Sequence, residues 1–169
     1  MTNLIYHVPA TTLWFVPAAA AQAEDSAFEM HNIATTVGRQ SAQQDLGAAA
    51  RASLFEWRAW VQFATAPVLG EIVQFWIKTS DGNYPDNDDG TGEGALSALD
   101  KTRNLHYIGA IQVDQTTANI EMVASGLVEI RARYVNIVMY NATADALTND
   151  VDENGFSLTA VPDQIQDTV

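Results

Sequence analysis

The most strongly patterned stretch of the chain is Leu127–Asn141, and its pattern changes partway along. In its first part apolar side chains alternate with charged ones, as in Ile130 beside Arg131. This period of two is typical of a strand with one buried face. From Tyr134 to Tyr140 nearly every residue is apolar, which predicts a strand that is covered on both faces. One cover is then the opposite sheet, and the other is a chain arm, a loop or another subunit.

Residues 53–79 form the clearest local unit, in which two alternating segments flank Ala66-Pro67. The apolar residues expected to face inward are Phe55, Trp57, Ala59, Val61 and Phe63, followed by Val73, Phe75 and Ile77. We interpret the unit as a hairpin. The favoured register sets Glu56 opposite Lys78, because opposite charges stabilise a cross-strand pair.

Shorter apolar segments separated by turn signals occupy most of the remaining chain. They are Asn3–Val8, Thr11–Val16, Ala27–Val37, Asn104–Asp114, Asn119–Ser125 and Gly155–Ala160. Gly126 is expected to allow the bend into the 127–141 strand, and residues 38–52 to hold at most one helical turn. Several short strands with almost no amphipathic helix predict an all-β fold, a jelly-roll-like antiparallel β-sandwich of about eight strands. We expect residues 1–26 to form an N-terminal arm or edge strands, and residues 27–169 a single β-sandwich domain.

The formal net charge of −13 bears on the partners of the protein, and no Lys or Arg lies beyond Arg133. A nucleic-acid or anionic-membrane partner requires a basic face, so both are set aside. There is no cysteine, which excludes a disulfide framework. Residues 1–12 lack the positive charge of a secretory signal, and no apolar run reaches the ~18–20 residues of a membrane span.

Two acidic segments are weak candidates for a metal site. Asp150, Asp152 and Asn154 match the opening half of a calcium loop, but Val161 stands where the motif requires glutamate. We therefore favour a turn that enters the last strand. Asp86 and Asp88 lie in a long acidic, glycine-rich loop.

The long loop, residues 80–101, brings several carboxylates together, and they repel one another unless a cation is within reach. We expect the acidic part of this loop, Asp81–Glu93, to be mobile, or ordered only by a cation. The three histidines are scattered, and no nucleophile motif occurs. The chain is therefore expected not to be an enzyme and to need no cofactor.

Trp60 and Trp76 fall on the polar face of the expected hairpin. They are covered by a second layer of the same subunit, form a subunit interface, or stack on sugar rings. Together with the two-sided strand, they favour an interface. The interface candidates are Trp60, Trp76, Tyr134, Val135, Ile137 and Met139. We expect a homo-oligomer, and a homotrimer in particular.

Residues 132–166, ARYVNIVMYNATADALTNDVDENGFSLTAVPDQIQ, resemble the end of small jelly-roll virion proteins of tailed bacteriophages. The resemblance rests on the long strand, the loop from Tyr140 to Thr143, and the closing segment from Leu158 to Ile165. It implies a non-enzymatic capsid decoration, or cement, protein that is often trimeric. Such a protein binds the major capsid protein or another virion protein on the capsid surface, after assembly in the host cytoplasm.

Two other classes of function stay open. One is a glycan-binding β-sandwich, such as a tail or receptor-binding component, that uses Trp60 and Trp76. The other is a small hydrolase with a dispersed carboxylate site.

Overall fold

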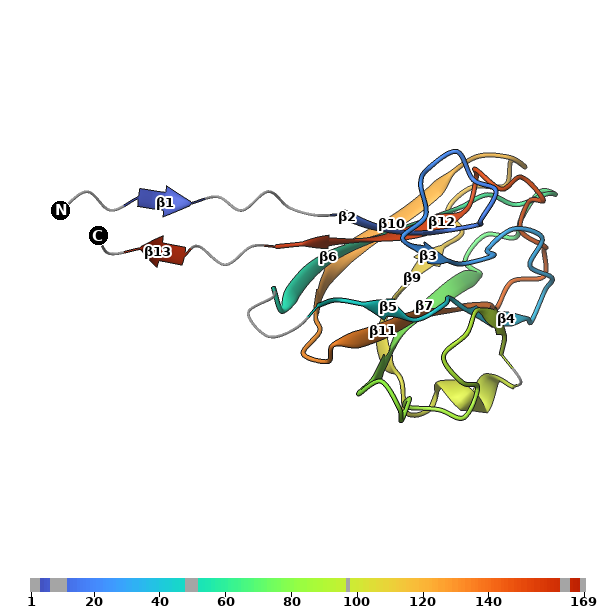
Figure 1. The fold of residues 1–169 in the computed structure, drawn as a ribbon. Helices are drawn as coiled ribbons and strands as arrows, with labels where there is room; N and C mark the ends of the chain where they lie inside the picture. Colours follow the sequence, from blue (N-terminus) through green and yellow to red (C-terminus); the bar gives the residue numbers. More distant parts are fainter. Residues whose placement is uncertain (1–3, 7–11, 48–51, 97, 162–164, 168–169) are drawn as a thin grey trace.

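A computed structural model of the chain describes residues 4–6, 12–47, 52–96, 98–161 and 165–167. Its regular structure is nearly all β, arranged as two facing sheets (Figure 1). In the order in which they lie side by side, the strands of the first sheet are β10 (Met122–Glu129), β6 (Leu54–Val61), β12 (Gly155–Ala160), β2 (Thr12–Val16) and β3 (Ser26–Ala27). The strands of the second sheet are β8 (Gly94–Ala95), β4 (Gly38–Gln40), β11 (Tyr134–Asn141), β7 (Ile72–Ser80) and β9 (His106–Gln112), and β5 (Gln44–Asp45) also pairs with β11.

The strand pairs are nested along the chain. The eight main strands, in chain order, are β2, β4, β6, β7, β9, β10, β11 and β12. The first of these pairs with the last, the second with the seventh, the third with the sixth, and the two middle strands with each other. All four of these pairs are antiparallel, so the chain is an antiparallel ribbon rolled into a sandwich, which is the arrangement of a jelly roll. The predicted fold class is confirmed.

The two ends of the chain extend the pair formed by β2 and β12, the first and last of the eight main strands. β1 (Leu4–Tyr6) pairs with β13 (Ile165–Asp167), and Leu4 lies opposite Asp167. Farther along, Thr12 of β2 lies opposite Thr159 of β12. From Leu4 to Thr12 the chain advances eight residues, and from Thr159 to Asp167 it also advances eight. The two pairs of strands therefore share one register. The paired ends project together from the sandwich (Figure 1).

The core between the sheets is built from aromatic side chains. The Trp57 ring stacks on Phe156 with a centroid distance of 6.0 Å and an interplanar angle of 3°. Phe75, from the opposite sheet, lies 5.8 Å from Phe156. A Cβ atom on Gly109 or Gly126 would come within 2.7 or 2.8 Å of the Trp57 indole. The Trp57 ring therefore requires glycine on β9 and on β10, the edge strands of the two sheets.

The predicted hairpin over residues 53–79 is wrong in its pairing. β6 and β7 occur where expected, but β6 pairs with β10 and β12, and β7 pairs with β11 and β9. The predicted inward residues are buried, and Trp57 and Phe75 face each other across the core at 6.4 Å. Alternation identifies the buried face of a strand, but it carries no information about which strand lies beside it.

The predicted single strand over Leu127–Asn141 is two strands in different sheets. Its alternating part is the end of β10, which runs through Gly126 without a break, and its apolar part is β11. The residues between Glu129 and Tyr134 turn the chain from one sheet to the other. The point where alternation ends therefore marks a change of sheet.

The segment between β2 and β6 also differs from the expectation. Of the predicted strand at 27–37, only Ala27, the second residue of β3, is extended in a sheet, although Phe28, Met30 and Ile33 are buried as expected. Asn32 and Thr36 have positive φ angles, 53° and 58°, which interrupt a strand. Residues 38–47 form β4 and β5 in place of a helical turn. No helix among the described residues is long and apolar enough to cross a membrane.

Candidate binding groove

The long loop between β7 and β9, residues 81–105, packs against the outer face of the second sheet. We call it the covering loop. Its Leu105 is buried together with Trp76 of β7 and Val138 of β11, and Leu96 packs against the same cluster. The second cover over the apolar strand is therefore a loop of the same chain, one of the three covers that the sequence left open.

A buried lysine fixes the covering loop to the sheet. The Lys78 side chain, on the outer face of β7, is fully buried. Its Nζ donates to Gln40 Oε1 at 2.8 Å and to the carbonyl oxygen of Gly90. Gln40, on β4, in turn donates from its amide to the carbonyl oxygens of Asp89 at 3.0 Å and Gly92 at 2.6 Å.

Asn136 completes this hydrogen-bonded layer from β11. Its Nδ2 donates to the carbonyl oxygen of Thr91 at 3.1 Å and to that of Ser41 at 2.8 Å. Lys78, Gln40 and Asn136 together satisfy four consecutive carbonyl groups, those of residues 89–92. We call these three side chains the latch. Buried carbonyl groups require such partners, so the latch holds the loop in one conformation.

The electrostatics of the covering loop depend on two lysines. Burial lowers the pKa of the Lys78 ammonium, and the carboxylates above it, led by Asp89, act in the opposite direction. Lys101 forms an ion pair with Asp88. The hydrogen bond between them lowers the pKa of the Asp88 carboxyl and raises that of Lys101. The acidic segment was expected to be mobile or to need a cation for order, whereas Lys78 and Lys101 lie beside its carboxylates in the folded chain.

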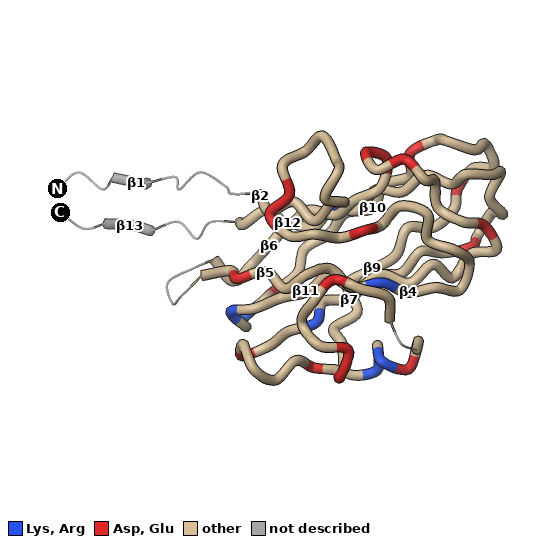
Figure 2. Tube along the Cα trace, turned by 45° about the vertical axis from the view of Figure 1, so that its right-hand side comes forward, with Lys and Arg blue, Asp and Glu red and all other residues tan. Residues whose placement is uncertain are grey.

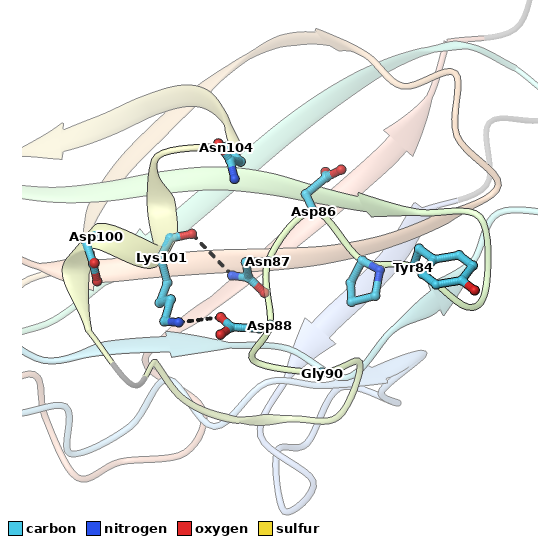
Figure 3. Close-up of a pocket in the computed structure, with 9 residues that line it drawn as sticks. Tyr84, Asp86, Asn87, Asp88, Gly90, Asp100, Lys101 and Asn104 are labelled. Atoms are coloured by element: carbon cyan, nitrogen blue, oxygen red, sulfur yellow. Dashed lines mark hydrogen bonds and ion pairs between the residues drawn. The ribbon is translucent and has the colours of Figure 1, made fainter.

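A groove of about 640 Å³ opens in the covering loop. Aromatic, carboxylate, amide and ammonium groups line it (Figure 3). The lining residues are Tyr84, Pro85, Asp86, Asn87, Asp88, Gly90, Asp100, Lys101 and Asn104. Tyr84 lies at one end of the groove and Asp100 at the other (Figure 3).

Hydrogen bonds hold the polar side chains of the groove in place. Asp86 Oδ2 accepts from the backbone nitrogen and the hydroxyl of Thr79, at 2.6 and 2.7 Å. Asn87 Oδ1 accepts from the Asp89 nitrogen at 3.2 Å, and Asn87 Nδ2 donates to the Lys101 carbonyl at 3.3 Å. The floor of the groove is therefore ordered by the protein itself.

The weak metal candidates have structural partners. Asp86 and Asp88 make the contacts given above. Asn154 is buried, and its Oδ1 accepts from the Gln62 nitrogen at 2.9 Å. Asp152 Oδ1 accepts from the Ala21 nitrogen at 2.6 Å, and Asp150 Oδ1 from the Asp152 nitrogen at 3.1 Å. Within the described part of the chain, no three His, Asp or Glu side chains are grouped to hold a metal ion.

Three of the interface candidates on β11 do not lie on the outside of the molecule. Val135, Ile137 and Met139 point into the core between the sheets and are fully buried. Tyr134 is half-buried, and the Arg133 guanidinium lies over its ring at 5.0 Å. The placement of these side chains removes the observation on which the predicted interface rested.

Trp60 and Trp76, the other two candidates expected on the surface, are also buried. Trp60 is buried against Trp14, with ring centroids 6.1 Å apart, and Trp76 against Tyr107 at 5.5 Å. The sequence pattern gave both as outward-facing because it reports only the sheet face, and it does not report what covers that face. Neither ring is available as a sugar platform.

The sequence analysis missed the latch and most of the groove. Lys78 and Gln40 have no motif around them, and Tyr84, Asn87, Lys101 and the other lining groups meet only when the loop folds. One signal was available, since Lys78 stands three residues before the start of the acidic loop at Asp81.

Figure 2 shows acidic residues spread over many loops of the sandwich, so the groove is one local part of a widely acidic surface. Comparison with protein-family models gives no match, and comparison with curated proteins gives no significant match.

Proposed function

We propose that this chain is a non-enzymatic structural protein of a tailed-bacteriophage virion, a decoration or cement protein that binds the assembled capsid and stabilises it. Two features support the proposal: the jelly-roll sandwich and the resemblance of residues 132–166 to such proteins. No residue is assigned a catalytic role.

The observation that carries the proposal is the terminal ribbon, defined as β1 with β13. It continues the register of the outermost strand pair away from the sandwich. Among the described residues, β1 and β13 pair only with each other. Each therefore presents a free backbone edge, and a free edge pairs readily with a strand of another protein. A ribbon of this kind suits attachment to a neighbouring subunit or to the shell.

The physical basis of the proposed function is linkage. A protein that binds the assembled lattice, and not the separated subunits, adds its binding free energy to the stability of the shell. A homotrimer that engages three symmetric sites at once gains further through effective concentration. The proposed partner is the major capsid protein or another virion protein.

The ribbon is tested by removing one backbone donor. In an Ile5→Pro variant the fixed φ and the missing N–H disrupt the ribbon at the position opposite Gln166, whereas Ile5→Ala keeps that donor and is the matched control. We expect Ile5→Pro to co-sediment less with parent particles stripped of this protein, and Ile5→Ala to bind at least several-fold better than Ile5→Pro. Both variants should melt like wild type, because the sandwich is unchanged.

Two results would contradict the proposal. One is an absence of wild-type binding to stripped particles at micromolar concentration. The other is the mass of a single chain in light scattering, both for the free protein and for protein released from particles. That mass would exclude the homotrimer.

A further inference from the structure

The groove in the covering loop combines an exposed aromatic ring with a polar floor. Tyr84 is 80% exposed, more than any other large hydrophobic side chain in the described part of the chain. Asp81 Oδ1 accepts from the backbone nitrogens of Asn83 and Tyr84, each at 2.8 Å, so the turn that carries the ring is held. An aromatic ring that is mostly exposed is available to stack on a ligand.

The floor of the groove offers hydrogen-bonding capacity to a ligand. One oxygen of Asp86 is engaged by Thr79, and one oxygen of Asp88 by Lys101. A carboxylate has about four acceptor sites, so both keep capacity for further bonds. Asn104 lies across the groove from Asp88 and supplies both donors and an acceptor (Figure 3).

The charge and size of the groove narrow the class of ligand. Asp86, Asp88 and Asp100 outnumber the single ammonium of Lys101 among the lining groups, which disfavours phosphate, sulfate and acidic sugars. The volume of about 640 Å³ lies within the range of small-molecule sites. Among the described residues that line the groove, Tyr84 and Pro85 carry the apolar side chains, and the others are polar, charged or glycine.

We propose that this groove binds a neutral oligosaccharide, whose sugar ring stacks on Tyr84 and whose hydroxyl groups bond to Asp86, Asp88 and Asn104. Sugar hydroxyls donate to the carboxylates and accept from the amide, and the C–H face of a ring suits the tyrosine. A cationic peptide fits less well, because the Asp88 carboxylate is already paired with Lys101.

The latch beneath the groove prepares it for binding. It fixes residues 89–92 and, with them, the Gly90 wall of the groove. A site that is ordered before the ligand arrives loses less entropy on binding. This inference does not depend on the proposed capsid role, since the groove and the terminal ribbon are different parts of the chain.

The experiment uses the full-length protein and a printed array of neutral and acidic glycans. It is followed by calorimetric titration with the best neutral trisaccharide among cellotriose, mannotriose, maltotriose and chitotriose. We expect a neutral glycan to bind, Tyr84→Ala to lose about tenfold or more in affinity, and Tyr84→Phe to keep most of it. Leu127→Ala is the control, because Leu127 is also exposed but does not line the groove.

Several outcomes would overturn the inference. They are binding of acidic glycans alone, binding of oligolysine or calcium but no neutral glycan, no binding to any of these probes, and a Tyr84→Ala variant that binds as well as wild type. Melting curves accompany each titration. Since Tyr84 is exposed, an unchanged melting temperature shows that a loss of affinity reports on the groove. Particle binding by the same samples is measured separately, so that failure of the capsid proposal is distinguishable from failure of this one.

Discussion

The two faces of β7 and β11 are both buried, but by different means. On the inner face Phe75, Ile137 and their neighbours pack against the opposite sheet, and the described part of the chain buries no charged side chain among them. On the outer face of the same strands, Lys78 and Asn136 are just as completely buried, and hydrogen bonds hold the covering loop there. The first face is stabilised by the apolar area removed from water.

The second face is stabilised by satisfied polar groups, which differ from apolar contacts in how they fail. The net gain from a buried hydrogen bond is modest, but leaving one partner unsatisfied costs about 1–3 kcal/mol. The inner face is shared by both sheets, whereas the latch supports one loop. Damage to the inner face should therefore unfold the whole domain, and damage to the latch should open the covering loop first.

The largest effect is expected for Phe75→Ala. Phe75 is fully buried between Trp57 and Phe156, and removal of such a ring costs about 3–5 kcal/mol in the free energy of unfolding. Urea unfolding measures the loss. The control is Leu127→Ala, which is 66% exposed and should change the same quantity by less than about 0.5 kcal/mol. A loss for Phe75→Ala no larger than the control would mean that the inner face is not the core.

A smaller and more local effect is expected for Lys78→Met. This change keeps the length of the side chain but leaves Gln40 Oε1 and the Gly90 carbonyl without their donor. Removal of a buried charge offsets part of the cost, so we expect a net loss of about 1–3 kcal/mol.

Amide exchange distinguishes loop opening from global unfolding in this variant. The Gln43 and Leu96 nitrogens, which bond to Thr91 and Gly38, should exchange faster, while the amides of β6 and β12 should change little. Equal acceleration at all of these sites would show that the latch and the core unfold as one unit.

The pH dependence of stability, measured for the wild type and for Lys78→Met, tests the burial of the lysine on the outer face. Burial lowers the pKa of Lys78 in the folded state below its ordinary value of 10.5. Between the folded and unfolded pKa values the unfolded chain binds more protons, so the free energy of unfolding rises with pH. Relative to Lys78→Met, the wild type should therefore gain stability as the pH rises toward 10.5, and lose that gain as the pH falls through the folded pKa. The raised pKa of Lys101 does not depend on Lys78, so its contribution is common to both proteins and cancels. Lys78 helps to lower the pKa of the Asp88 carboxyl, but that group titrates at acid pH, outside this window. A flat difference would show that the lysine carries no burial penalty.

The smallest effect is expected for Lys101→Ala. This change breaks the ion pair with Asp88, whose side chain is 76% exposed. Exposed pairs are screened by water and salt, so the urea midpoint should move no more than in the Leu127→Ala control. A large shift that persists in high salt would mean that the covering loop depends on this pair as well as on the latch.

These two faces also show what sequence patterns can predict. Alternation identified Phe75 and Ile77 as buried, because a period of two is a local property of the strand. It placed Lys78 and Trp76 outside, since cover supplied by a loop leaves no periodic signal in the strand that it covers. The sandwich class could be predicted, whereas the pairing of β6 with β12 depends on residues almost a hundred positions apart.

The candidate site was less predictable than the fold. Asp86 and Asp88 were selected for their charge, but their roles depend on Thr79 and Lys101, which the sequence does not mark as neighbours. For Trp60 the sequence suggested a role that the structure does not support. Tryptophan is typical of interfaces, yet this one lies over Gly155, where a Cβ atom would come within 2.3 Å of the indole. Residue type alone does not report such a fit.

The nested strand pairs have a consequence for the order in which the chain can fold. Among the four nested pairs, β7 with β9 joins the strands that lie nearest each other in sequence, while β2 must wait for β12 at the far end of the chain. Closing a longer loop costs more entropy, and contacts distant in sequence slow folding. During synthesis the N-terminal strand therefore emerges from the ribosome long before its partner exists. We expect Phe15 and Trp14 to stay exposed until the last strand is released, which makes the nascent chain a client for chaperones and any truncated product prone to aggregation.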